Sequence, residues 1–437
     1  MNPINDKNYN EALDFLYSFV DYERNSTWKY NSDYFDLSRV EQFFSSLGNP
    51  HKKGWFVHIA GTNGKGSVAA MIASALIQSG YKTGLYTSPH LLSFHERIKI
   101  NDSMISKNDV VEGVRRIQKA EKSFDDLTFF EVWTGLAFDH FAHKSVDVSV
   151  VEVGIGGILD TTNVILPAVS VITSISLDHI GKLGNTVEKI TCEKAGIMKP
   201  GIPVVSAPQE TRVMRILEKQ AKELRTEITS VGSDVQYSKV HNGINYNGIN
   251  WNIDDIHVPL AGHFQRENAA VALAVLETLA TNGYNITPES SRCGIEKVHW
   301  PGRLQSLAEK PEVIVDGACN VSAMSAVRDY LLEKKTGGTI VAVFGICGDK
   351  EVGQILEIIG QAATHFIFTH ADNPRAMDAH DIARLYRKEN HVVENDPVRA
   401  LKRAIVMAGA DGLVIVTGSL YLVGEILKYY GKDNAHQ

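Results

Sequence analysis

The decapeptide HIAGTNGKGS at positions 58–67 has the composition of a loop that holds phosphate groups. It joins a predicted strand to a predicted helix, so backbone N–H groups and a helix N-terminus would face an incoming anion. Its glycines let the backbone turn, Lys65 supplies a positive charge, and Ser67 supplies a hydroxyl. The alternative is a glycine-rich turn without a ligand, which has no need of the lysine and the hydroxyl together. The residues that we predict to bind nucleotide here are Gly61, Thr62, Asn63, Gly64, Lys65, Gly66 and Ser67.

The spacing within this loop departs from the common pattern G-x-x-x-x-G-K-[ST]. Ile59 occupies the position of the first glycine, and Gly66 separates Lys65 from the hydroxyl residue. The prediction of a nucleotide site therefore depends on the residue types and on the strand–helix context.

Three more polar side chains follow predicted strands. Ser88 and Glu152 lie at the carboxyl ends of two strands, and His179 comes shortly after a third. Open α/β sheets bind ligands outside the carboxyl ends of their strands. We therefore expect Ser88 and Glu152 at a ligand site, whereas His179 is either such a residue or a loop histidine that bonds to backbone.

The elements that position these residues follow an alternating order. Short β-branched runs alternate with helical stretches over most of the chain, which predicts an α/β fold with a parallel sheet covered on both faces. An alanine-rich helix is expected at 66–80. The strands expected in the first half are 55–59, 82–86, 146–153, 169–175 and 203–206.

The rhythm changes at 231–257, where polar and apolar residues alternate around NG turns and predict a β-meander. A helix is expected at 264–282, and the proline and glycine of KVHWPGR at 297–303 predict a hinge. A second α/β series follows, with strands expected at 312–316, 339–344, 365–369 and 413–417. We therefore predict two domains, residues 1–297 and residues 298–437.

The composition is that of an ordinary globular protein. Of the 437 residues 44% are hydrophobic and 22% are charged, and the net charge of −7 offers no basic excess for nucleic acid. No apolar run approaches the roughly 20 residues that cross a membrane, and the polar segment 1–15 lacks a signal-peptide core. Four cysteines without CxxC spacing favour a reducing compartment. We expect a cytoplasmic monomer that binds neither nucleic acid nor membrane.

Together with the loop, an ordered series of motifs resembles the folylpolyglutamate synthase and dihydrofolate synthase family of Mur-type ligases. The resemblance runs from about Leu47 to Glu425, and the shared order is far more specific than any single motif. The motifs are LGNP, GTNGKGS, TSPHL, TFFE, VEVGIGG, SLDHIGKLG, EKAGIMKPG, FQRENAA, WPGR, VDGACN, GICGDK, DNPRA and VTGSLYLVGE.

The resemblance implies an N-terminal P-loop ATPase domain with a mostly parallel sheet and a smaller, Rossmann-like C-terminal α/β domain. It implies an amide ligase that uses ATP and Mg²⁺ to join L-glutamate to a folate through an acyl phosphate. Dihydropteroate is the second acid that such enzymes extend.

Metal-binding and catalytic roles also follow from the resemblance. Family members hold a metal ion with the residues at the positions of Ser88, Glu152 and His179. They carry the lysine at the position of Lys194 as a carbamate, an anionic oxygen donor that suits a second Mg²⁺. The resemblance thus implies Lys65, His179 and Lys194 as the catalytic residues.

The family holds ATP with residues at the positions of Asn268, Arg303 and Asp316. A guanidinium fork such as that of Arg303 can brace phosphate oxygens, and a carboxylate such as that of Asp316 can accept from ribose hydroxyls. Because these residues come from both predicted domains, ATP is expected in the cleft between them, and domain closure would assemble the site.

The segments TFFE at 128–131 and GGILD at 156–160 resemble parts of the family's pterin pocket. Aromatic rings suit a flat heterocycle, although plain core packing is the alternative for Phe129 and Phe130. Asp316 and Ser419 are candidate contacts for the amino acid. The substrate-binding residues implied in all are Thr128, Phe129, Phe130, Glu131, Leu159, Asp160, Thr161, Cys319 and Ser419.

Three positions depart from the family's pattern. Cys319 and Val321 replace the histidine and proline of DGAHNP, and Ile158 replaces the arginine of GGRLD. The missing histidine is associated with the incoming glutamate, and the missing arginine can bind a carboxylate or phosphate. Two alternatives therefore stay open: a Mur-type ligase for another acid or amine, and a nucleotide-binding pseudoenzyme. A simple P-loop ATPase or kinase would not need the second α/β domain.

Overall fold

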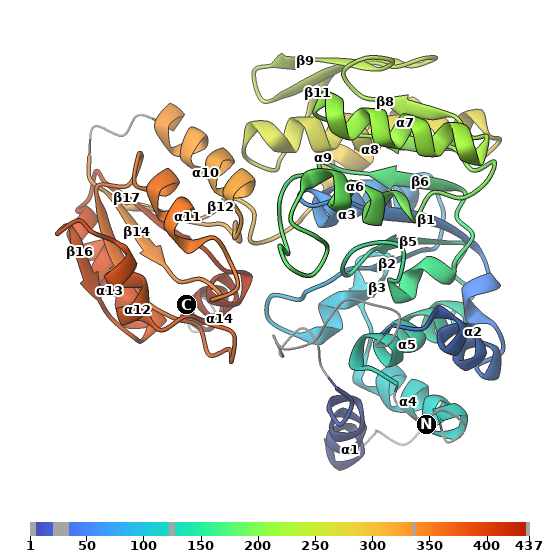
Figure 1. The fold of residues 1–437 in the computed structure, drawn as a ribbon, viewed down its shortest axis with the longest axis horizontal. Coiled ribbons are helices and arrows are strands. Elements are labelled where there is room, and N and C mark those ends of the chain that lie inside the picture. Colours follow the sequence, from blue (N-terminus) through green and yellow to red (C-terminus); the bar gives the residue numbers. More distant parts are fainter. Residues whose placement is uncertain (1–5, 21–34, 122–126, 335–337, 434–437) are drawn as a thin grey trace.

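The computed structural model describes residues 6–20, 35–121, 127–334 and 338–433. Figure 1 shows two α/β bodies beside each other, with the orange and red C-terminal segment forming the smaller one. The strands of the larger body are β1 (Trp55–Ala60), β2 (Thr83–Tyr86), β3 (Ile98–Ile100), β4 (Ser103–Met104), β5 (Val148–Glu152), β6 (Val169–Ile172), β7 (Val204–Ser206), β8 (Ile228–Ser230), β9 (Gln236–Val240), β10 (Gly243–Asn247) and β11 (Asn252–His257). Those of the smaller body are β12 (Gln305–Glu309), β13 (Glu312–Val315), β14 (Ile340–Phe344), β15 (His365–Phe368), β16 (His391–Val393) and β17 (Leu413–Thr417).

Fourteen α-helices lie in the part of the chain that the structure describes. They are α1 (Asp6–Tyr17), α2 (Leu37–Ser46), α3 (Lys65–Gln78), α4 (Lys107–Glu121), α5 (Phe129–His143), α6 (Val187–Ala195), α7 (Thr211–Leu224), α8 (His263–Thr281), α9 (Pro288–Lys297), α10 (Val321–Lys334), α11 (Val352–Ile359), α12 (Ala379–Leu385), α13 (Pro397–Ala408) and α14 (Leu420–Asp433). None of these helices is both long and apolar enough to span a bilayer.

The eight-stranded sheet of the larger body has the order β4-β3-β2-β5-β1-β6-β7-β8, and its strands are parallel from β2 to β8. Side chains of β1 alternate between its two faces: Phe56 packs in the cluster of α5, while Val57 and Ile59 pack in the cluster of α3 and α8. Helix α3 is buried nearly all round, which explains why its sequence is apolar on every face. The predicted α/β architecture is confirmed.

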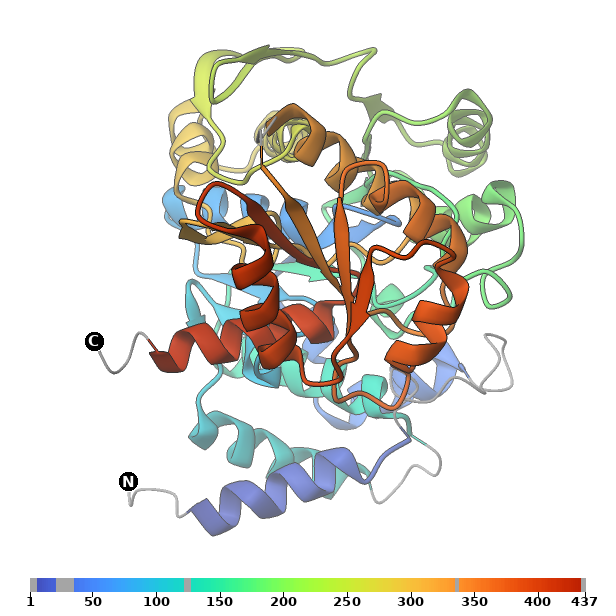
Figure 2. The same ribbon diagram turned by 90° about the vertical axis from the view of Figure 1, so that its left-hand side faces the viewer.

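The smaller body repeats this arrangement with a six-stranded sheet in the order β12-β13-β17-β14-β15-β16, in which only β12 is antiparallel. Ile314 and Phe344 face the cluster of α10 and α11, whereas Val315 and Val343 face the cluster of α13 and α14. Figure 2 looks onto this body and shows helices on both sides of its sheet. The expected domain boundary at 298 falls between α9 and β12.

The meander expected at 231–257 is confirmed as the antiparallel sheet β11-β10-β9. No strand is expected at the positions of β3, β4, β8, β12 and β16, which are short or half-exposed and lack a long apolar run. The strand expected at 169–175 ends at Ile172. Beyond it, the Ser174 carbonyl accepts hydrogen bonds from the backbone N–H groups of Thr62 (2.8 Å) and Asn63 (3.2 Å). The chain therefore leaves the sheet there to hold the phosphate loop.

Candidate active site

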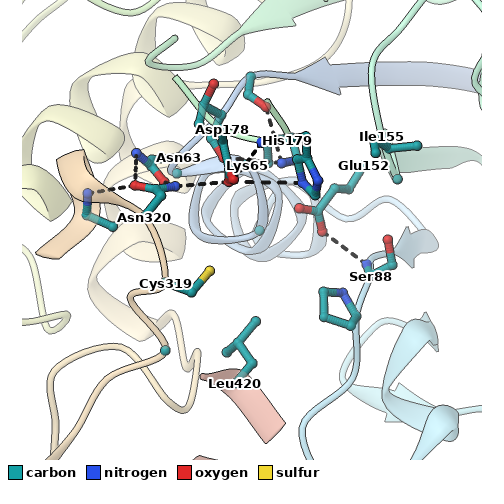
Figure 3. A pocket seen from close by; sticks show the side chains of 18 of the residues that line it. Asn63, Lys65, Ser88, Glu152, Ile155, Asp178, His179, Cys319, Asn320 and Leu420 are labelled. Atoms are coloured by element: carbon teal, nitrogen blue, oxygen red, sulfur yellow. Dashed lines mark hydrogen bonds and ion pairs between the residues drawn. The ribbon is translucent and has the colours of Figure 1, made fainter. Parts of the chain in front are cut away.

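A cavity of about 390 Å³ lies where the two bodies meet, at the carboxyl ends of four neighbouring strands of the larger sheet. The phosphate loop follows β1, Glu152 ends β5, Ser88 follows β2, and His179 follows β6. Residues 316–320 and 418–421 close the cavity from the smaller body. Figure 3 shows Lys65, Glu152 and His179 beside one another, with Cys319 and Leu420 across the cavity.

The phosphate loop is shaped by its contact with α8. Gly64 is the N-cap of α3 and has a left-handed backbone with φ of 89°. A Cβ atom there would lie 2.5 Å from Oδ1 of Asn268, so only glycine fits. The Lys65 ammonium folds back over the loop and donates to the carbonyls of Gly61 (3.2 Å) and Thr62 (3.4 Å). This geometry puts a positive charge and a helix N-terminus at one end of the cavity.

A second ammonium group reaches the same loop. Lys194 is 5% exposed and its Nζ donates to the Gly61 carbonyl at 2.7 Å. Burial, together with the nearby charge of Lys65, lowers the pKa of Lys194 to about 7. The structure therefore keeps a large fraction of this lysine as a neutral amine at neutral pH, and a neutral amine is the form that reacts with CO₂.

Glu152, Ser88 and His179 offer a set of donors for a divalent cation. The buried Glu152 carboxylate accepts the backbone N–H of Ser88 at 3.1 Å, and burial raises the pKa of this carboxyl. Burial also lowers the pKa of His179 to about 3, which keeps its imidazole neutral, the form that ligates metals. The Nδ1 atom of His179 is buried and makes no hydrogen bond within the described chain.

This donor set fits Mg²⁺. Mg²⁺ takes few protein ligands and retains several waters. Among the described residues no group of three or more His, Cys, Asp and Glu side chains is gathered as a complete metal cage. The carboxylate, hydroxyl and imidazole of this group therefore suit a cation that also binds phosphate oxygens and water.

The nucleotide positions expected in the second half of the chain lie on the same cavity. Asn268 donates to Gln265 (2.9 Å), which in turn donates to the Ser67 hydroxyl (3.3 Å). The Asp316 carboxylate is 4% exposed and accepts the backbone N–H groups of Leu304 (2.9 Å) and Ala318 (2.8 Å). These bonds fix the turn that carries Arg303, which also lines the cavity.

Two models of the Mur ligase family match the chain: the Mur ligase middle domain over residues 59–276, and the glutamate ligase domain over residues 302–420. A dihydrofolate synthase/folylpolyglutamate synthase of Bacillus subtilis is 34% identical over 405 residues, which span 90% of this chain and 94% of that protein. This chain belongs to the folylpolyglutamate synthase/dihydrofolate synthase family of Mur ligases. It is an ATP-dependent ligase of this type.

Solved structures of the family share the whole fold. E. coli FolC in complex with DHPP and ADP superimposes with a TM-score of 0.88 at 27% identity and covers 98% of each chain. The bifunctional folylpolyglutamate synthase/dihydrofolate synthase of Yersinia pestis, complexed with AMPPNP and Mn ion, has a TM-score of 0.85 at 28% identity. That match covers 97% of this ligase and 98% of the Yersinia chain.

Most of the predicted site residues line the cavity. Those from the larger domain are Gly61, Thr62, Asn63, Gly64, Lys65, Gly66, Ser67, Ser88, Phe130, Glu152, Leu159, Asp160, Thr161, His179, Lys194 and Asn268, and those from the smaller one are Arg303, Asp316, Cys319 and Ser419. The Ser419 hydroxyl accepts the backbone N–H of Tyr421 at 3.2 Å and so also caps α14.

Three residues of the TFFE segment do not line the cavity. Thr128 and Glu131 form a capping box at the start of α5, and Glu131 is also paired with Arg39 at 2.7 Å. Phe129 is 3% exposed and packs against Trp133. Only Phe130 lines the cavity, because the helical turn points consecutive side chains in different directions.

Asp160 lines the cavity but is already bonded to the chain. Its carboxylate accepts the N–H groups of Gly154 (3.0 Å), Ile155 (3.0 Å) and Thr162 (2.9 Å) and the hydroxyl of Thr162 (2.5 Å). Four donors fill the usual acceptor sites of a carboxylate. Asp160 therefore braces the turn that follows Glu152.

Ile158 and Cys319, the two departures from the family's pattern that left the identity of the substrate undecided, differ in their distance from the cavity. Ile158 is 42% exposed and lies outside the cavity lining, where it packs against Gly196 at the end of α6. Cys319 does line the cavity. Burial raises the pKa of its thiol, so the thiol is protonated at neutral pH and is not an activated nucleophile.

Sequence analysis missed a polar group that joins the two domains. Lys350 pairs with Asp178 at 2.5 Å, and Asn320 donates to Asp178 at 3.1 Å and to Asn63 at 2.9 Å. Although burial works against it, His179 and Lys350 hold the pKa of Asp178 below its usual range. A signal was present, because each of these residues follows a predicted strand within a quoted motif, but pairing across domains is not visible from spacing.

Proposed function

We propose that this ligase joins L-glutamate to the carboxylate of a folate, and of dihydropteroate, with ATP and Mg²⁺. The observation that carries the proposal is the single cavity that contains the phosphate loop, an apolar wall and a group of cations. Phe130 and Leu159 form the apolar wall, and Lys350 and Arg375 lie on the smaller domain. DHPP and ADP bound to E. coli FolC support this assignment.

The phosphate loop and the cations around it would hold ATP. Lys65 and Arg303 can neutralise charge on the γ-phosphoryl group, and the N-terminus of α3 faces the same end of the cavity. Asn268 and Asp316 would fix the rest of the nucleotide. Ser88, Glu152 and His179 would hold Mg²⁺, which supplies charge neutralisation at the phosphate oxygens when it is bound.

The reaction then needs two steps. A carboxylate oxygen of the folate or pteroate attacks the γ-phosphorus, the bond to the β–γ bridging oxygen breaks, and ADP leaves. The amine of glutamate attacks the resulting acyl phosphate, inorganic phosphate leaves, and a proton is lost from nitrogen. The residues of this chain serve both steps by alignment and by charge, which are the main means of phosphoryl-transfer catalysis.

The glutamate is expected at the smaller domain, beside the leaving phosphate. Lys350 and Arg375 place positive charge there, although Asp178 and Asp349 respectively pair with them. Cys319 and Ser419 line the same wall. Carboxylate groups of an amino acid would exchange with these internal partners when it binds.

Lys194 is proposed to act as a carbamate. Its neutral amine adds CO₂, a C–N bond forms, and one proton is released from nitrogen, so a neutral amine becomes an anion beside the metal-binding residues. The lowered pKa of Lys194 favours this reaction, because only the neutral amine adds CO₂. The carbamate would also remove the repulsion between Lys194 and Lys65.

The test is a product analysis with ATP, Mg²⁺ and a matrix of acids and amino acids. We expect ADP and a mass gain of one glutamate on tetrahydrofolate or dihydropteroate. A product with a different amine would reject glutamate as the substrate and make Cys319 a specificity residue. ADP without any amide, or bound nucleotide without turnover, would favour a pseudoenzyme.

A further inference from the structure

Leu91 connects the metal-binding segment of the larger domain to the core of the smaller one. It belongs to the loop that follows β2 and starts at Thr87. Its side chain packs against the cluster that contains Val423 and Ile426 on the opposite domain. This apolar contact therefore joins the two domains.

The contact between this loop and α14 is close at the backbone level. A Cβ atom built at Gly424 would lie 2.2 Å from the carbonyl oxygen of Leu91. A Cβ atom built at Gly302, which precedes Arg303, would lie 3.1 Å from Cδ1 of Leu91. The leucine is thus seated between the interdomain connection and the first turns of α14.

The loop itself is braced, so a displacement at Leu91 reaches its neighbours. The Glu96 carboxylate accepts the backbone N–H groups of Leu91 (2.8 Å), Leu92 (2.9 Å) and Ser93 (2.8 Å). At the start of the loop, the N–H of Thr87 donates to the carbonyl of Arg97 at 3.1 Å. These bonds make the segment a compact unit.

Ser88 lies in this unit, three residues before Leu91. Its backbone N–H donates to the Glu152 carboxylate at 3.1 Å, a bond that Figure 3 shows at the edge of the cavity. One end of the unit therefore touches the proposed metal-binding residues, while the other end is held by the smaller domain.

We propose that Leu91 is a positioning residue that sets Ser88 against Glu152 only while the smaller domain is docked. Docking of α14 onto Leu91 completes the metal-binding group, and the same contact places Gly302 and hence Arg303. This inference rests on the proposed metal site, and it adds a cause for its assembly: the binding of the cation is coupled to the position of the C-terminal domain.

The test compares Leu91→Ala with Leu92→Ala, its neighbour, whose side chain is 52% exposed. Mn²⁺ binding is followed by electron paramagnetic resonance in the presence of a non-hydrolysable ATP analogue, and amide hydrogen exchange is followed over residues 87–97. We expect Leu91→Ala to weaken Mn²⁺ binding about tenfold and to speed exchange, as loss of an outer-shell partner does. Leu92→Ala should change neither quantity.

Two further variants separate positioning from a general loss of packing. Leu91→Met conserves volume and should restore Mn²⁺ affinity. Gly424→Ala disturbs the same contact from the side of the smaller domain, because its Cβ atom would press on the Leu91 carbonyl. It should weaken Mn²⁺ binding in the same way as Leu91→Ala. Nucleotide binding without a metal should be unchanged in Leu92→Ala and Leu91→Met.

The outcomes also separate this inference from the proposed metal site. Loss of Mn²⁺ affinity in Glu152→Gln but not in Leu91→Ala overturns the inference and leaves the metal site intact. Unchanged affinity in both variants overturns the metal site, and the inference with it. Equal effects of Leu91→Ala and Leu92→Ala would also overturn the inference.

Discussion

Replacement of Lys350 by methionine is expected to loosen the contact between the two domains. Nζ of Lys350 lies 2.5 Å from Oδ1 of Asp178, and the two side chains are only 9% and 12% exposed. Methionine conserves the length of the side chain and removes the charge. The variant leaves the Asp178 carboxylate with Asn320 as its remaining partner on the smaller domain.

The magnitude follows from burial. At this separation and an effective dielectric constant of about 20, two unit charges attract each other by about 7 kcal/mol, and desolvation of both groups offsets much of that attraction. Removal of one partner of a buried pair costs about 3–5 kcal/mol. We expect Lys350→Met and Asp178→Asn each to lower the free energy of local opening by about 3 kcal/mol, with a coupling energy of about 1.5–3 kcal/mol between them.

The assay is native-state amide hydrogen exchange over residues 174–184 and 316–322, measured for both single variants and for the double variant. Arg399→Met is the matched control, since Arg399 pairs with Glu394 on the exposed surface of the smaller domain. Loss of this exposed ion pair should not change the exchange rates measurably. Additive effects of the two single changes would refute the pairing. Unchanged exchange in Lys350→Met would show that the pair does not hold the domains together.

Three other outcomes follow from the site. Glu152→Gln should weaken Mn²⁺ binding about ten- to hundredfold by removing the charge of a ligand, and an unaltered calorimetric titration would reject that role. The CO₂ adduct of Lys194 should increase between about pH 6 and pH 8 at constant dissolved CO₂, because the pKa is lowered to about 7 and the neutral amine gains as pH rises. Mass spectrometry with Lys194→Arg as the control checks this, and an adduct independent of pH contradicts it. Cys319→His should lower the KM for glutamate about tenfold. Ile158→Arg should leave the KM unchanged because Ile158 lies outside the cavity. A higher KM in Cys319→His would show that the pocket is built around the thiol.

Local patterns determined the elements and the order in which they occur. The apolar run of β1, the alanine-rich α3 and the NG turns of the meander each depend on neighbours within a few residues, so the period of the sequence is sufficient to predict them. The phosphate loop is predictable for the same reason. Its glycines, Lys65 and the strand–helix context are contiguous in the chain.

The sequence could also place Ser88, Glu152 and His179 after strands, but the strand order decided that they would meet. Only the arrangement β2-β5-β1-β6 brings the ends of these strands next to one another. Tertiary contacts also decided that β6 ends at Ile172, because the residues that follow bond to the phosphate loop instead of to the sheet.

Tertiary structure alone decided which side chains of similar type reach the cavity. Phe130 lines it while Phe129 is in the core, and Cys319 lines it while Ile158 is on the surface. The pair of Asp178 and Lys350 is equally invisible in the sequence, since 172 residues separate its members. Such contacts depend on how two separate sheets dock, and the hydrophobic periodicity of a segment predicts its own helix or strand but not which distant surface it will contact.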